Sequence, residues 1–264
     1  MKRLILVAIF ILLLIIKVIH DTTTLKVKAI SIENDKLIEG EKVSILQISD
    51  VHSRNLDGKY HHLLELEPDL IVLTGDLIDR REMDLENTRK LLEQLVTLER
   101  PIYFVSGNHE HDSLIFHKLR CLLVEFNVIE LYNQFELIEV NGVELNLVGV
   151  ANHSTGYAHL GAAIFGVDFA KPTILLSHSP YIPEQKFDLM LSGHTHGGQI
   201  RLPLIGAITA PEQGFFPKYD KGLYQLDSGT PLYIDSGLGT SWLPVRLFNE
   251  AQVTMVRIMS AGVE

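Results

Sequence analysis

Apolar and amphipathic segments alternate along residues 43–128 of the chain. The apolar runs KVSILQIS, DLIVLTG and PIYFVSG are short and continuous, which is typical of buried β-strands. Between and after them lie segments with helical spacing, namely YHHLLELE, MDLENTRKLLEQLVTL and residues 113–126. In the second of these, Leu91, Leu92 and Leu95 fall on one stripe. This part of the chain therefore predicts a sheet whose outer face is covered by helices.

After residue 128 the pattern changes to closely spaced strands. We expect strands at FELIEV, VELNLVGV, PTILLS, FDLMLSG, GLYQL, PLYID and AQVTMVRI, separated by turn residues such as Asn141-Gly142. Strands followed by helices and then mostly by strands favour a layered α/β fold with a large central pair of sheets.

The first twenty residues, MKRLILVAIFILLLIIKVIH, differ from the rest of the chain. Leu4 to Ile19 would span about 24 Å as a helix, somewhat less than the ~30 Å hydrocarbon core of a bilayer. No small-x-small cleavage pattern follows, so we interpret residues 1–20 as an uncleaved transmembrane signal anchor. A cleaved secretory signal and a buried core helix are the alternatives. Lys2 and Arg3 favour a cytoplasmic N-terminus and hence an extracytoplasmic body at the cell membrane.

The anchor is expected to lead into a tether and then into one domain. Residues 21–42 are polar enough for a tether, and the alternation in TLKVKAISIE indicates a possible edge strand within it. Residues 43–264 are predicted to form the single folded domain, which is long enough to bury a sizeable core.

Charge and cysteine content exclude some classes of function. Beyond residue 20 the chain holds 20 basic and 33 acidic residues, a formal net charge of −13, which repels polyanions and makes nucleic acid an unfavourable partner. Cys121 is the single cysteine, so no intrachain disulfide can form. It lies among apolar residues, and we assign it no thiol chemistry.

Side chains that bind metals follow five of the predicted strands. These strand ends supply Asp50 and His52; Asp76; Asn108 and His109; His178; and His194 and His196. Because ligands of open α/β sheets bind beyond the carboxyl ends of the strands, we expect the five segments to meet at one place. Each motif alone is weak evidence, whereas all five in order are strong evidence.

This set of side chains suits a site that hydrolyses phosphate esters. Two divalent cations can clamp a phosphoryl group and activate a shared water, and a carboxylate that bridges them offsets their repulsion. Mixed nitrogen and oxygen ligands favour Mn, Fe, Zn, Co or Ni over Mg or Ca, and we expect Mn. In SGHTHGGQI, His194 and His196 are expected to alternate about an extended Thr195, with Gly197-Gly198 leaving room near a substrate.

The motifs SDVH, GD, GNHE, SH and SGHTHGGQI resemble the ordered signature of the calcineurin-like metallophosphoesterase superfamily over about residues 43–258. GHTHGGQIRLP, LYIDSGLGTSWLPVR and the apolar N-terminus resemble its bacterial membrane- or wall-associated phosphodiesterases of the YkuE and YaeI type. The resemblance implies a four-layer αββα sandwich and in-line attack by a metal-bridging hydroxide. It implies these roles: Asp50, His52 and His196 on one metal, Asn108, His178 and His194 on the other, Asp76 bridging, and His109 as the catalytic residue that is not a ligand.

Substrate contacts and alternative functions complete the expectations. Arg201, His111 and His153 are candidate contacts to a phosphate-ester substrate. A pyrophosphatase of lipid-linked nucleotide sugars, as in UDP-diacylglucosamine hydrolases, is one alternative to a phosphodiesterase. A non-catalytic, metal-stabilised binding domain of the cell envelope is another, although such a module would not need His109.

Overall fold

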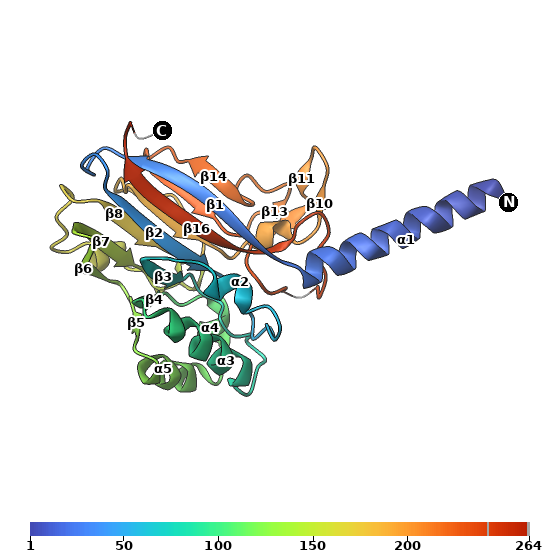
Figure 1. The fold of residues 1–264 in the computed structure, drawn as a ribbon, viewed down its shortest axis with the longest axis horizontal. Coiled ribbons are helices and arrows are strands. Elements are labelled where there is room, and N and C mark those ends of the chain that lie inside the picture. Colours follow the sequence, from blue (N-terminus) through green and yellow to red (C-terminus); the bar gives the residue numbers. More distant parts are fainter. Residues whose placement is uncertain (242, 263–264) are drawn as a thin grey trace.

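The computed structural model describes residues 1–241 and 243–262. Trp242, which belongs to the motif LYIDSGLGTSWLPVR, lies outside the described residues. The described chain forms a body of two packed sheets, from which one long N-terminal helix projects (Figure 1).

The first sheet is mixed and has the strand order β1-β16-β2-β3-β4-β5. Its strands are β1 (Leu25–Asn34), β2 (Lys42–Ile48), β3 (Leu70–Leu73), β4 (Ile102–Phe104), β5 (Val128–Glu130) and β16 (Ala251–Ser260). β2, β3, β4 and β5 run parallel to one another, and β16 is antiparallel to β2. The carboxyl ends of β2, β3 and β4 therefore lie at the same edge of this sheet.

The second sheet has the order β14-β15-β9-β8-β7-β6. Its strands are β6 (Gln134–Val140), β7 (Val143–Gly149), β8 (Thr173–Leu176), β9 (Leu189–Ser192), β14 (Gly222–Gln225) and β15 (Pro231–Ile234). The four central strands are parallel, and β6 and β14 are antiparallel edge strands. β6 and β7 are joined by Asn141 and Gly142, whose positive φ angles of 53° and 82° suit a tight hairpin turn.

Two small hairpins follow β9 that the hydrophobic pattern did not predict. β10 (Arg201–Leu202) pairs with β11 (Gly206–Ala207), and β12 (Thr209–Ala210) pairs with β13 (Gly214–Phe215). Strands of two residues are too short to show an alternation of apolar and polar positions, so the sequence pattern could not reveal them.

Apolar side chains fill the space between the two sheets and the space under the helices. Ile45 and Val72 from the first sheet pack with Leu147 and Leu176 from the second in one buried cluster. α2 (His61–Leu64), α3 (Glu86–Leu95), the short η1 (Val96–Leu98) and α5 (Phe116–Glu125) accompany the first sheet, and Leu92 and Leu119 share a second cluster with Ile71. The predicted helices are thus confirmed, with shorter bounds than their sequence patterns.

The expected four-layer α/β sandwich is confirmed, but its two outer layers are unequal. The outer face of the second sheet is covered by the short α6 (Leu160–Ala163) and by loop residues such as Phe169 and Phe187, which pack on Val148 and Leu175. Because the connections between β7, β8 and β9 hold few residues with helical spacing, this layer consists mostly of loops.

The N-terminal helix α1 (Lys2–Thr23) is long and apolar enough to cross a membrane. One residue, Thr24, separates it from β1, which pairs with β16 at ten consecutive positions. The segment 21–42, where the sequence led us to expect a tether, therefore holds the last turn of α1, the edge strand β1 and the turn into β2.

Candidate metal centre

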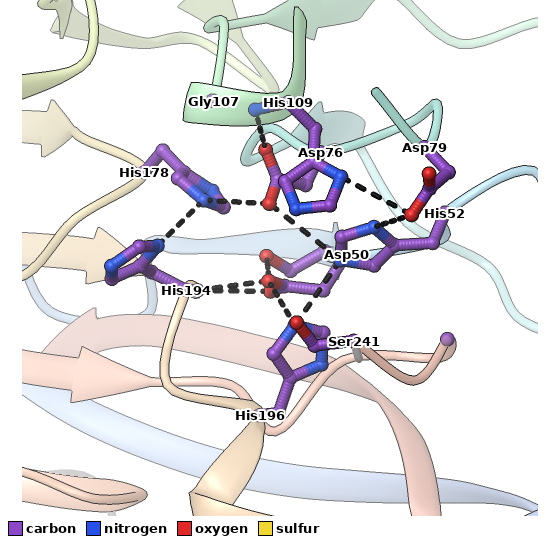
Figure 2. Close-up of polar contacts among 12 residues, drawn as sticks. Asp50, His52, Asp76, Asp79, Gly107, His109, His178, His194, His196 and Ser241 are labelled. Carbon is purple, nitrogen blue, oxygen red and sulfur yellow. Dashed lines mark hydrogen bonds and ion pairs between the residues drawn. The ribbon is translucent and has the colours of Figure 1, made fainter. Parts of the chain in front are cut away.

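The five segments with metal-binding side chains meet where the carboxyl ends of the parallel strands of both sheets face each other (Figure 2). β2 delivers Asp50 and His52, β3 delivers Asp76, and β4 leads into α4 (Asn108–Asp112), which carries Asn108 and His109. β8 delivers His178, and β9 leads to His194 and His196 in and before η3 (His196–Gly198). The side chains of Asp50, Asp76, His178, His194 and His196 are almost completely buried.

Three groups of these side chains could each hold a cation, and two of the groups share no residue: Asp50, His52 and His196 form one, and Asp76, His178 and His194 form the other. The third group, His52, Asp76 and His109, overlaps the first two. Within each group the candidate ligand atoms lie within 4.8 Å of one another. Asp76 Oδ2 lies 3.2 Å from Nε2 of His178 and 3.5 Å from Nε2 of His52, so the same oxygen faces both of the first two groups.

Ring nitrogens face each other inside each of the two groups that share no residue. Nε2 of His52 is 3.1 Å from Nε2 of His196, and Nε2 of His178 is 3.2 Å from Nδ1 of His194. Two neutral imidazole nitrogens at this distance must share either a proton or a cation, because two lone pairs repel each other. A metal ion between them would satisfy both.

The opposite ring nitrogen of His178 has a hydrogen-bond partner that leaves its facing nitrogen free. His178 Nδ1 is 2.8 Å from the carbonyl oxygen of Thr74, so it carries the proton. Carboxylates lie near two of the other three rings without a hydrogen bond to them: Asp79 Oδ2 is 3.8 Å from Nδ1 of His52, and Glu212 Oε1 is 3.2 Å from Nε2 of His194. An outer partner such as the Thr74 carbonyl fixes the tautomer and orientation of a metal-binding histidine. The donor set therefore fits a pair of divalent cations.

Asn108 adds an oxygen that has no partner within the protein. Its Oδ1 is buried and accepts no hydrogen bond among the described residues. A buried amide oxygen without a hydrogen bond is costly, so a cation or an ordered water is needed to satisfy it.

The electrostatics of the site favour positive charge. Burial lowers the pKa of His178, but the neighbouring Asp76 carboxylate outweighs burial and raises it to about 10. Burial likewise opposes ionisation of Asp76, yet His178 holds the pKa of that carboxyl well below its usual range. Without a metal, a proton on His178 thus neutralises the charge of the Asp76 carboxylate. A bound cation would take over this role.

The backbone at the site is strained. Positive φ angles occur at five of the predicted metal ligands: Asp50 (51°), His52 (49°), Asp76 (52°), His194 (71°) and His196 (50°). Residues with a Cβ rarely adopt this region, and such strain gathers at functional sites. Thr195 between the two histidines is not extended as expected but helical, with φ −78° and ψ −15°. The left-handed turns at His194 and His196, not an extended chain, aim the two rings.

Glu110 is a structural residue of the site that the sequence left undecided. It is fully buried, and its carboxylate accepts the backbone N–H groups of Asp76 (2.8 Å), Gly107 (2.7 Å) and Ile78 (3.2 Å). Glu110 therefore ties the Asp76 turn to the start of α4. Its position three residues after Gly107, where a glutamate caps a helix, is the signal that could have revealed it.

His109 lies beside the two groups, with its ring edge against His52 at a centroid distance of 4.3 Å. Its Nδ1 accepts the backbone N–H of Arg80 at 3.1 Å, so in the neutral ring the proton is on Nε2. Burial lowers the pKa of His109 to about 4. Its own backbone N–H donates to Asp76 Oδ1 (2.9 Å), which fixes the start of α4 against the shared carboxylate.

The three predicted substrate contacts lie at different places. His111 lies on α4, stacks on Tyr157 and lines a polar cleft together with Asn108. Arg201 donates to Asp220 Oδ2 (2.7 Å) and to the Gly197 carbonyl (3.0 Å), so its guanidinium already has partners. His153 stacks on Tyr181 and lines a different cavity from the one that contains Asn108.

Sequence reasoning did not select Asp79 or Glu212. Asp79 Oδ2 lies 3.4 Å from Nδ1 of His109, and the nearby His52 ring holds the pKa of Asp79 well below its usual range. Both acids belong to loops rather than to the ends of strands. No spacing rule connects them to the metal motifs.

Comparison with known proteins agrees with this geometry. Residues 43–198 match the family of calcineurin-like phosphoesterases. The chain is 31% identical to the metallophosphoesterase YkoQ of Bacillus subtilis strain 168, over 90% of this chain and 92% of that protein. It is 29% identical to YkuE of the same organism, over 83% and 79%, and 32% identical to a Bos taurus transmembrane protein with a metallophosphoesterase domain, over 83% and 53%.

The resemblance noted in the sequence is thus confirmed, and the alternative of a non-catalytic binding domain is set aside. The order of the motifs, the convergence of their side chains and the family match all agree. The chain belongs to the calcineurin-like phosphoesterase family and is a metal-dependent phosphoester hydrolase.

Proposed function

We propose that this protein is a membrane-anchored phosphodiesterase with a two-metal centre, with Mn as the favoured metal. The proposed ligands are Asp50, His52 and His196 for the first cation, Asn108, His178 and His194 for the second, and Asp76 for both. The two groups of clustered side chains and the shared Asp76 Oδ2 support this assignment. When bound, two divalent cations would neutralise phosphoryl oxygens and activate water for in-line attack.

His109 is proposed as the catalytic residue that binds no metal. Because its Nδ1 accepts the Arg80 N–H, its Nε2–H is available to donate to a phosphoryl oxygen or to the leaving alkoxide. Its low pKa keeps the ring neutral at pH 7, and a neutral ring still donates through Nε2. The Arg80 backbone N–H holds this orientation.

The observation that supports a diester substrate is a pair of separate clefts, each lined by one of the proposed metal ligands. A cavity of about 370 Å³ begins at His196 and is lined by apolar residues such as Ile200 and Ile208. A second, of about 430 Å³, begins at Asn108 and is lined by polar residues such as Glu212. A phosphodiester carries two substituents on its phosphorus, and each cleft can take one of them.

Two chromogenic substrates with the same leaving group test the proposal. We expect the full-length protein with Mn²⁺ to show a higher kcat/KM for bis-p-nitrophenyl phosphate than for p-nitrophenyl phosphate. His109→Ala should lower kcat by roughly 10²- to 10⁴-fold while the bound Mn²⁺ is unchanged. His117→Ala, an exposed histidine on α5, is the matched control. A preference for the monoester would refute the phosphodiesterase, and an unchanged rate in His109→Ala would refute the role of His109.

We also propose that residues 1–20 anchor the protein in the cell membrane and that the phosphoesterase domain of residues 43–264 is extracytoplasmic. The length and apolar composition of α1 support the anchor, and Lys2 and Arg3 before the apolar stretch support the orientation. Protease added to intact cells should degrade the domain. Degradation only after lysis would refute the outward orientation.

A further inference from the structure

The end of α1 is fixed to the body by side-chain hydrogen bonds. Asp21 is fully buried, and its Oδ2 accepts the backbone N–H of Asn249 at 3.3 Å. Thr22 Oγ1 accepts the backbone N–H of Arg246 at 2.8 Å, and its carbonyl accepts the guanidinium of Arg54. With β1 beginning at Leu25, no flexible linker separates the helix from the sheet.

This attachment places one surface of the body beside the last turns of α1. Phe248 lies between Arg246 and Asn249 in the sequence, and the Lys17 ammonium is 5.8 Å from the centroid of its ring. Phe248 lines a surface depression together with Leu202, Leu204 and Ile205 from the β10–β11 hairpin. Figure 1 shows β10 and β11 on the side of the body from which α1 leaves.

The tip of this hairpin, residues 202–205 (the hairpin tip), is apolar and exposed. Leu204 is fully exposed, Ile205 is 59% exposed, and Phe248 is 41% exposed. Scattered exposed leucines are common, but a contiguous apolar patch marks a contact surface. This patch lies next to Lys17, which follows the uninterrupted apolar stretch of α1 and is placed to extend its ammonium to the membrane interface.

We propose that the hairpin tip and Phe248 lie in the interface of the same bilayer that α1 crosses, so that the domain rests on the membrane in one fixed orientation. This inference rests on the proposed membrane anchor. The fixed helix end prevents the body from tumbling at the end of a tether, and insertion of the tip removes its apolar side chains from water. The bilayer is thus a partner of the domain as well as of the helix.

Quenching by nitroxide lipids tests the proposal in the full-length protein. The exposed Cys121 is first replaced by Ser, and single cysteines are introduced as Leu204→Cys, Ile38→Cys and Ile9→Cys and labelled with a fluorophore. Ile38 is the matched control because it is 72% exposed and lies beyond the far end of β1, about 30 Å or more from α1. Each protein is reconstituted in vesicles of phosphatidylethanolamine and phosphatidylglycerol that carry acyl-chain nitroxides.

We expect strong quenching at positions 9 and 204 and little at position 38. Quenching at 9 together with equal, weak signals at 204 and 38 would overturn the inference while leaving the anchor intact. A lack of quenching at position 9 would refute the anchor itself, and the inference with it. Phosphodiester hydrolysis is a separate measurement, so loss of the proposed activity would not mimic either result.

Discussion

At the scale of single residues, buried polar groups behind the metal ligands hold the strained turns in place. Asp235 is buried behind the Asp50 turn and accepts hydrogen bonds from Gly237 (2.6 Å), Thr254 (2.5 Å) and Gln252 (3.2 Å). A Cβ on Gly237, whose φ is 71°, would approach Asp50 Cβ to 2.5 Å, so only glycine allows this close contact. These contacts secure the turn that carries Asp50.

The carboxyl of Asp235 makes stability depend on pH. Burial raises its pKa to about 6 from an ordinary value of 3.8. The folded state therefore binds the proton more tightly than the unfolded state, and the stability that this provides below pH 4 is lost as pH rises towards 6. Asp235→Asn should abolish that loss of stability, because Asn does not titrate. The free energy of unfolding of the variant minus that of the natural protein should therefore rise between pH 4 and pH 7, by on the order of 3 kcal/mol.

Urea unfolding of both proteins without metal at several pH values measures this effect. The comparison concerns the slope with pH and not the absolute stability, because Asn also changes the hydrogen bonds. A difference between the two proteins that is constant with pH would contradict the prediction.

At the scale of elements, the glycine pair after His196 allows close packing of the chain segments that follow β9. A Cβ on Gly198 would overlap Ala207 of β11, and one on Gly197 would lie 2.8 Å from Asn249 Oδ1. The two residues, with φ of 57° and 76°, let η3 contact the β10–β11 hairpin and the 246–249 segment. The glycine pair thus has a packing role, and Gly198 also lines the cavity at His196, so the expectation that the pair leaves room near a substrate stays a prediction.

The end of α1 is expected to influence the first metal through these elements. Asp21 holds Asn249, whose Nδ2 donates to the His196 carbonyl at 2.6 Å. Asp21→Ala in the full-length protein should weaken Mn²⁺ binding roughly 10- to 100-fold, as is typical for changes behind a metal ligand. Calorimetric titration with Mn²⁺ measures the affinity of each variant. Thr23→Ala is the control, because within the described part of the chain the Thr23 hydroxyl donates only to the Ile19 carbonyl of the same helix. Equal affinity in both variants would contradict the coupling.

At the scale of the whole molecule, the metal centre joins the two sheets. Asp50, Asp76 and Asn108 come from the first sheet, whereas His178, His194 and His196 come from the second. Gln47 of the first sheet also donates to the Ser192 carbonyl of the second at 2.9 Å. Cations bound between these side chains would hold the two halves together, and their removal would leave buried carboxylates and imidazoles without a common partner.

Removal of metal should therefore lower the stability of the whole domain. At a free Mn²⁺ concentration of about 100 Kd the gain is about 2.7 kcal/mol, which corresponds to a rise in Tm of roughly 5–10 °C for a domain of this size. Thermal unfolding in EDTA and in Mn²⁺ measures the shift. Asp76→Asn should lose most of it and His117→Ala should keep it; a shift of the same size in Asp76→Asn would argue against the bridging carboxylate.

The sequence by itself determined the longer strands, the main helices, the apolar N-terminal segment and the residue types at the strand ends. Hydrophobic period and motif order are local properties, so one chain is enough to reveal them. Only the tertiary structure decided which ring nitrogens face each other and that Glu110, Asp79 and Glu212 surround the site. It also decided that Arg201 already has a partner and that Asp21 fixes the anchor helix to the body. These contacts join segments that are far apart in the chain. The packing of the two sheets sets the distances between those segments in space, and the hydrophobic period of each segment carries no information about them.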